Sequence, residues 1–150
     1  MRTVPHQQIA DVHTRPPATL VVTWKDGSVE KVDLSAVLAR SRTLAPLRDP
    51  DLFQRAHVGE WGWSVAWTDD LDLSSQQLWR WAGEQNGDFM PADDFRAWME
   101  HNGLSLSKAA DALGISRRMV AYYTGGERPI PKTIRLATVG FDALKHGMAA

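Results

Sequence analysis

GLSLSKAADALGISRRMVAYY, the stretch at residues 103–123, predicts two short helices joined by a tight turn. Ser105 and Ser116 each precede an apolar helical pattern, and serine is a favoured N-cap because its hydroxyl accepts a hydrogen bond from a free backbone N–H. Gly114 is expected to end the first helix, because the turn needs a residue that tolerates a positive φ. The small Ala110 suits the point at which two steeply crossing helices approach each other.

Helical patterns continue on both sides of this stretch. A helix is expected from Pro91 to Asn102. Its apolar face consists of Phe95, Trp98 and Met99. Pro131 is expected to open a further helix, because proline suits the first helical position. The apolar residues of that helix are Ile134, Ala137, Phe141 and Leu144. Residues 91–150 therefore form a helical domain in this interpretation.

The helix predicted at residues 117–123 leaves one polar face uncovered, because Val120 and Tyr123 belong to the apolar residues around the turn. The outward positions are Ser116, Arg117, Arg118, Met119, Ala121 and Tyr122. The adjacent arginines have no partner nearby in the sequence. An arginine fork matches guanine O6 and N7, and each such pair contributes about 1–3 kcal/mol of discrimination between bases.

Charge is unevenly distributed along the chain, whose formal net charge is −1. Residues 1–90 have 9 basic and 12 acidic side chains, whereas residues 91–150 have 8 basic and 6 acidic ones. Residues 116–135 include five basic side chains and a single acidic one, Glu127. Local sign matters more than the total for phosphate binding, so this segment is the predicted nucleic-acid surface.

Residues 103–123, followed by Gly126-Glu127-Arg128-Pro129, resemble the lambda-repressor-like (XRE-type) helix-turn-helix family. The resemblance implies that the third helix of the domain enters the major groove and that the start of the second touches phosphate. Carried over, base-reading positions fall on Arg117, Arg118 and Tyr122, and phosphate-facing positions on Ser105 and Ser107. Leu106 departs from the glutamine often present in the family. With the rest of the outward face and the basic segment, the candidate DNA-binding residues are Ser105, Ser107, Ser116, Arg117, Arg118, Met119, Ala121, Tyr122, Arg128, Lys132 and Thr133.

The first eighty residues are typical of short strands and turns instead. Residues 20–24 and 29–33 flank an Asp-Gly turn and predict a hairpin. Short helices are expected at residues 35–40 and from Asp49-Pro50. Large and small residues alternate over residues 61–68, which predicts a strand. Ser74 or Ser75 is then expected to cap a helix through Ala82.

Residues 43–53 and 67–73 resemble the bacterial family called domain of unknown function 2442. The resemblance implies a compact α+β unit, sometimes fused to a helix-turn-helix and sometimes encoded near toxin–antitoxin pairs. Residues 83–88 contain two glycines and no apolar residue, which indicates a linker. The predicted fold class is α+β: an α+β domain at residues 1–83, a linker at 84–90, and an all-α lambda-repressor-like helix-turn-helix domain at 91–150.

Other functional classes find little support. The histidines lack metal-ligand spacing, there is no cysteine or nucleophile-elbow serine, and Pro131 interrupts a phosphate-loop outline, so no catalytic residue, metal or cofactor is expected. Asp69, Asp70 and Asp72 lack the rest of a calcium loop and are interpreted as turn and cap residues. Neither a membrane span nor a signal peptide is apparent, and a chain without cysteine fits the cytoplasm.

Six of the seven tryptophans precede the linker: Trp24, Trp61, Trp63, Trp67, Trp79 and Trp81. Most are expected in the core rather than on a ligand platform, with Trp63 and Trp81 as candidates for an interface. The predicted function is sequence-specific binding of double-stranded DNA by a homodimeric, non-enzymatic transcriptional regulator. The alternative is an antitoxin-like interaction module that binds a protein partner through the N-terminal domain.

Overall fold

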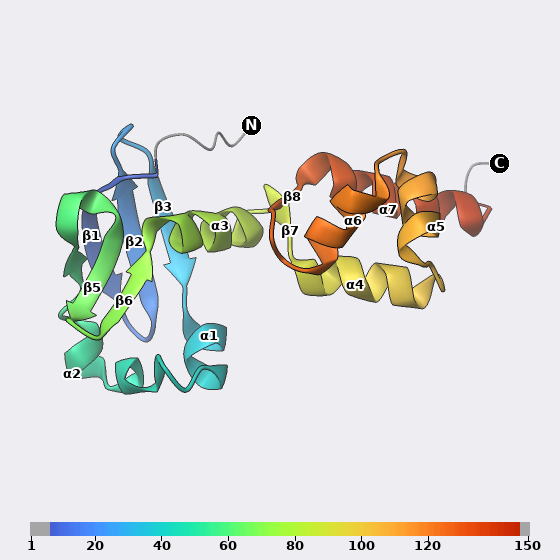
Figure 1. Ribbon diagram of the computed structural model, residues 1–150. Coiled ribbons are helices and arrows are strands. Elements are labelled where there is room, and N and C mark those ends of the chain that lie inside the picture. The colour runs from blue at the N-terminus through green and yellow to red at the C-terminus, as the bar shows by residue number, and fades with distance from the viewer. Residues whose placement is uncertain (1–6, 148–150) are drawn as a thin grey trace. The chain divides into compact units, whose positions relative to one another are not determined.

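The structure, a computed structural model, describes residues 7–147 and divides into two compact units (Figure 1). The first unit extends to Gln85, and the second begins at Asn86. The first unit contains two small sheets and short helices, whereas the second is mainly helical (Figure 1). The protein is therefore of mixed α and β structure.

One antiparallel sheet of the first unit has the strand order β1-β2-β3. Its strands are β1 (Ile9–Arg15), β2 (Thr19–Trp24) and β3 (Val29–Asp33). The predicted hairpin is confirmed as β2 and β3, with Gly27 at a φ of +88° in the turn. The sequence pattern does not predict β1, because its buried residues Ile9 and Val12 are three apart across a register shift.

The second sheet has the order β4-β5-β6, with β4 at His57–Val58, β5 at Ser64–Thr68 and β6 at Leu71–Ser74. The strand predicted over residues 61–68 is wrong in its first part, because Glu60–Gly62 form the 3-10 helix η2. A Cβ on Gly62 would lie 2.5 Å from the carbonyl oxygen of Ile9. The chain thus turns tightly against β1 at a position that only glycine can fill.

The helices of the first unit are α1 (Ser35–Arg40), η1 (Ala45–Arg48), α2 (Pro50–Phe53) and α3 (Ser75–Gln85). Ser74, rather than Ser75, caps α3, since its Oγ accepts a 3.1 Å hydrogen bond from the Gln77 N–H. At the other end of α3, Gln85 Nε2 donates to the Asp33 carbonyl and Gln85 Oε1 accepts from the Asp33 N–H, each at 2.8 Å. The Gln85 amide therefore pairs with β3, an edge strand.

The tryptophans of the first unit divide between core and surface. Trp24, Trp67 and Trp79 are buried, as expected, and Trp67 Nε1 donates to the Phe53 carbonyl at 2.9 Å. The side chains of Trp61 and Trp63, however, are 77% and 52% exposed. The core assignment is wrong for Trp61, because η2 places it on an outward turn with a φ of 59°.

The second unit has four helices in its described part: α4 (Ala92–His101), α5 (Leu106–Leu113), α6 (Arg117–Thr124) and α7 (Lys132–Lys145). These confirm the predicted helices. The unit is not all-α, because β7 (Phe89–Met90) and β8 (Ile130–Pro131) form a two-stranded antiparallel sheet. Strands of two residues are too short to show a period, and proline is tolerated at a sheet edge.

The core of the second unit contains buried residues from every one of these elements except α7, whose Ile134 and Phe141 are partly buried and pack against it. Its buried side chains are Met90, Phe95, Trp98, Met99, Ala109, Ala110, Val120, Tyr123 and Ile130. Phe95 of α4 meets Tyr123 of α6 edge to face, with ring centroids 5.7 Å apart. Asp142 Oδ1 of α7 accepts hydrogen bonds from Trp98 Nε1 at 3.1 Å and Asn102 Nδ2 at 3.0 Å. Helices α4, α6 and α7 are thereby held together.

The segment between the elements of the two units is shorter than the linker predicted at residues 84–90. Glu84 and Gln85 belong to α3, and Phe89 and Met90 form β7, so residues 86–88 alone lie outside regular structure. The glycines and polar residues at 83–88 are typical of a loop, so the sequence pattern does not predict that α3 continues to Gln85. Within residues 7–147, no helix is long and apolar enough to cross a membrane.

Candidate nucleic-acid interface

The turn between α5 and α6 fixes the start of α6. Gly114 adopts the left-handed conformation, with φ 70° and ψ 31°, and its N–H donates to the Ala110 carbonyl. Ile115 N–H donates to the same carbonyl at 3.1 Å. Ser116 Oγ then accepts a 3.1 Å hydrogen bond from Met119 N–H, which caps α6. Each of these positions follows from the sequence pattern.

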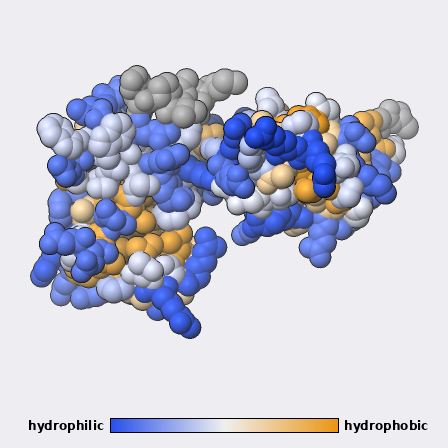
Figure 2. Space-filling model, viewed as in Figure 1, coloured by the Kyte–Doolittle hydropathy of each residue, from blue (hydrophilic) through white to orange (hydrophobic). Residues whose placement is uncertain are grey.

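Helix α6 has one buried and one outward face. Val120 and Tyr123 lie in the core, while Arg117 and Arg118 are exposed at the first turn. Tyr122 is half-buried on the outward side. Figure 2 shows hydrophilic residues gathered over α6 around a small apolar area. The helix is thus anchored from within and presents arginines to solvent.

A cavity of about 280 Å³ opens on this face. It is lined by Ser116, Arg118, Met119, Tyr122 and Arg128, none of which is acidic. Arg118 Nε donates a 2.9 Å hydrogen bond to the Tyr122 hydroxyl oxygen. Arg128 Cζ lies 4.4 Å from the centroid of the Tyr122 ring, a cation–π contact. Two guanidinium groups are therefore held around one tyrosine.

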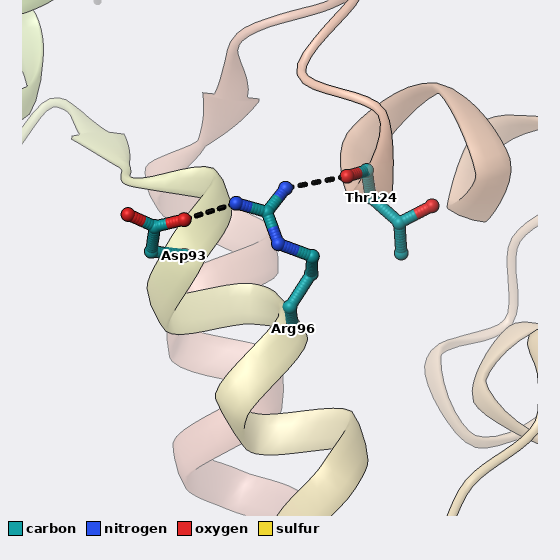
Figure 3. Close-up of polar contacts among 3 residues, drawn as sticks. All are labelled: Asp93, Arg96 and Thr124. Atoms are coloured by element: carbon teal, nitrogen blue, oxygen red, sulfur yellow. Dashed lines mark hydrogen bonds and ion pairs between the residues drawn. The ribbon is translucent and has the colours of Figure 1, made fainter.

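The C-terminal end of α6 is held by Arg96 of α4 (Figure 3). Arg96 Nη1 donates to the Thr124 carbonyl at 2.5 Å, and Nη2 is paired with Asp93 in the preceding turn. A positive charge at a helix C-terminus also complements the helix dipole. The sequence pattern does not identify Arg96, because a basic residue three positions after Asp93 is typical of an ordinary surface ion pair and nothing local points to Thr124.

The remaining candidates lie outside the cavity lining. Ser105 Oγ caps α5 by accepting from Lys108 N–H at 3.1 Å, and Ser107 is exposed as the second residue of that helix. Lys132 and Thr133 are exposed at the start of α7. Arg117 is exposed on α6, whereas Ala121 is half-buried there. Five of the eleven candidates, those of the cavity, are brought into one cluster.

Two further properties bear on the chemistry of this unit. Burial raises the pKa of the Tyr123 hydroxyl, and the positive charge of Arg128 opposes that shift. No group of three or more histidine, aspartate or glutamate side chains within residues 7–147 is placed to hold a metal ion. Asp69 and Asp70 lie in the turn after β5, while Asp72 lies in β6.

Comparison with known proteins supports the N-terminal resemblance. A search of curated proteins found no match. The chain is similar to the solved structure "Crystal Structure of Putative DNA Binding Protein NE0471 from Nitrosomonas europaea ATCC 19718", at 42% identity and a TM-score of 0.54, over 91% of this chain and 86% of that chain. A family described as "Protein of unknown function (DUF2442)" matches residues 9–84. The chain belongs to the DUF2442 family.

Proposed function

We propose that the second unit binds double-stranded DNA sequence-specifically, with α6 as a recognition helix in the major groove. The observation that carries the proposal is the outward face of α6, where Arg117 and Arg118 are exposed on a helix anchored at both ends. The N. europaea protein, named as a DNA-binding protein on a provisional basis, supports it. In this proposal α5 and α6 are the helix-turn-helix of an XRE-type domain.

Electrostatics favour the same face. The side chains of Arg117, Lys132 and Arg135 make no hydrogen bond or ion pair with other residues in the range 7–147. An unpaired, exposed basic group can neutralise a phosphate and release its counterion without first breaking an internal contact. A purely structural helix pair would not need this concentration of uncompensated charge.

The contacts divide by chemistry. Arg117 and Arg118 are nearest the base edges or the flanking phosphates in a docked complex, with Tyr122 beside them. Lys132 and Thr133 begin α7, where backbone amides favour an anion, so they are assigned to phosphate. Ser105 and Ser107 are assigned to phosphate at the start of α5. In this proposal the protein is a cytoplasmic regulator and not an enzyme. It is assigned as a homodimer, because one short helix reads only a few base pairs.

The experiment is selection of bound duplexes from a random pool, followed by binding isotherms at two salt concentrations. The wild-type affinity is expected to fall with salt by a slope of about −0.9 per phosphate contact. Lys132→Ala is expected to weaken binding to selected and scrambled duplexes alike and to reduce the salt slope by about one. At least one of Arg117→Ala and Arg118→Ala is expected to lose about 1–3 kcal/mol on the selected duplex only.

Lys31→Ala is the matched control, since it removes one exposed positive charge from β3 in the first unit. It should leave both affinities unchanged. Salt-independent affinity of the wild type, or wild-type affinity in all three test variants with an intact circular dichroism spectrum, would contradict DNA binding by this face.

A second candidate function is a protein interaction through the first unit, favoured by the exposure of Trp61 and Trp63. Trp61 also holds a left-handed backbone conformation, which is costly for a non-glycine residue and often marks a functional position. If this function holds, Trp61→Ala and Trp63→Ala should release a co-purifying small protein and leave DNA affinity unchanged. A protein that purifies alone under native conditions would count against it.

A further inference from the structure

We propose that Tyr122 is a positioning residue that aims Arg118 end-on at a guanine. The inference rests on the proposed DNA binding and identifies which arginine reads the base. Arg118 and Tyr122 are four residues apart on α6, so their side chains are neighbours on one helix face. Arg118 Nε is already engaged, because it donates to the Tyr122 hydroxyl at 2.9 Å.

The engaged Nε decides which edge of the guanidinium remains available. Arginine has five N–H donors in a planar fork, and the side-on edge uses Nε together with one terminal nitrogen. With Nε bound to Tyr122, the end-on pair Nη1 and Nη2 is the edge left for a bidentate contact. That pair matches two adjacent acceptors, which in the major groove are guanine O6 and N7.

Tyr122 is itself held in place. Arg128 Cζ lies 4.4 Å from its ring centroid, whereas Arg118 Cζ lies at 5.7 Å and reaches the hydroxyl end. Both guanidinium groups thus lie over the ring, Arg128 more closely, and the hydroxyl fixes Arg118 in addition. Because the cavity lining has no acidic side chain, it fits a ligand group rich in acceptors. Adenine is a poorer match, since it presents an N6 donor beside N7.

Arg117 differs in this respect. Its side chain makes no hydrogen bond or ion pair with other residues in the range 7–147, so nothing orients its fork before binding. An exposed arginine of this kind is suited to phosphate, where the geometry is less demanding. The base-reading role therefore falls to Arg118, and the phosphate role falls to Arg117.

The test uses the full chain and the duplex selected from the random pool, with each guanine replaced in turn by 7-deazaguanine, which lacks the N7 acceptor. At one position the wild type is expected to lose about 5- to 150-fold in affinity, because the N7 acceptor of the bidentate contact is gone. Tyr122→Phe, which removes the hydroxyl alone, should lose most of that sensitivity, because Arg118 Nε then lacks the partner that holds it. Arg118→Ala, which removes the fork altogether, should lose that sensitivity as well.

Tyr123→Phe is the matched control, because it removes a hydroxyl from the next residue, whose ring faces the core. It should retain the full 7-deazaguanine effect. Specific binding by the wild type without any sensitive guanine, or Tyr122→Phe with undiminished sensitivity, would overturn the positioning role and leave DNA binding intact. Absence of salt-dependent binding by the wild type would instead overturn the proposed function, and this inference with it.

Discussion

Gly114 is the residue on which the placement of α6 depends most directly. A Cβ at this position would meet nothing within 4 Å, so adding a Cβ costs backbone strain and no clash of that atom. Gly114→Val is expected to lower the free energy of unfolding by about 1–2 kcal/mol or more, because its φ of +70° is unfavourable for a β-branched residue. Urea denaturation measures the change, and DNA affinity should fall with it.

Gly114→Asn is the comparison variant, because asparagine tolerates the left-handed conformation better than valine. It should be less destabilising. If the valine variant were as stable as the wild type, the turn geometry described for Gly114 would be wrong.

Tyr123 makes the stability of the second unit depend on pH in the alkaline range. Burial raises the pKa of its hydroxyl above the ordinary value, so the folded state holds the proton more tightly than the unfolded state. The stability this contributes is complete below the unfolded pKa of about 10 and is lost as pH rises through the folded pKa. Tyr123→Phe should lack that part of the alkaline decline in urea denaturation. An identical decline in both proteins would show that Tyr123 does not titrate on unfolding.

At the residue scale, the local sequence pattern predicts which side chains of α6 are buried. It does not predict contacts between residues that are far apart in the sequence. The apolar spacing separates Val120 and Tyr123 from Arg118 correctly. The role of Arg96 depends on a carbonyl 28 residues away, at Thr124, which no local pattern encodes. The exposure of Trp61 likewise follows from the approach of Gly62 to Ile9, which only the folded chain creates.

Among the elements, α4 and α7 are joined by polar contacts as well as by apolar packing. Asp142→Ala is expected to lower the free energy of unfolding by about 1–3 kcal/mol, because the Trp98 and Asn102 donors lose their acceptor in a partly buried setting. Asp142→Asn, which keeps a carbonyl oxygen, should cost less. Thermal unfolding measures both, with Asp111→Ala on the exposed side of α5 as control. If Asp142→Ala were as stable as that control, Asp142 would not contribute to holding α7 against α4.

Elements with strong local signals are the ones that sequence reasoning placed well. The serine caps of α5 and α6 and the Asp-Gly turn between β2 and β3 each satisfy a specific backbone need. The pairing of β7 with β8 joins residues about forty positions apart, and each strand has two residues, so neither propensity nor period reveals it. The same limit applies to β6. Its four residues, Leu71–Ser74, alternate over too short a stretch to distinguish a strand from a turn.

The two units meet in sequence at residues 86–88, and this has a consequence for the whole chain. Gly87 adopts a φ of +89° and residues 86–88 lie outside regular structure, so a protease of low specificity should cleave here early. Two protected fragments are expected, identified by mass spectrometry and N-terminal sequencing. Cleavage confined to the chain ends, with one unfolding transition by every probe, would indicate a single cooperative domain.

The Gln85 amide has a practical consequence for anyone who isolates the first unit. The family match ends at residue 84, so a fragment cut at that boundary would lack the side chain that pairs with Asp33. The backbone N–H and C=O of Asp33 would then be open on an edge strand, and such edges pair readily with other molecules. A fragment that ends at residue 84 should self-associate at concentrations at which one extended through Gln85 remains monomeric.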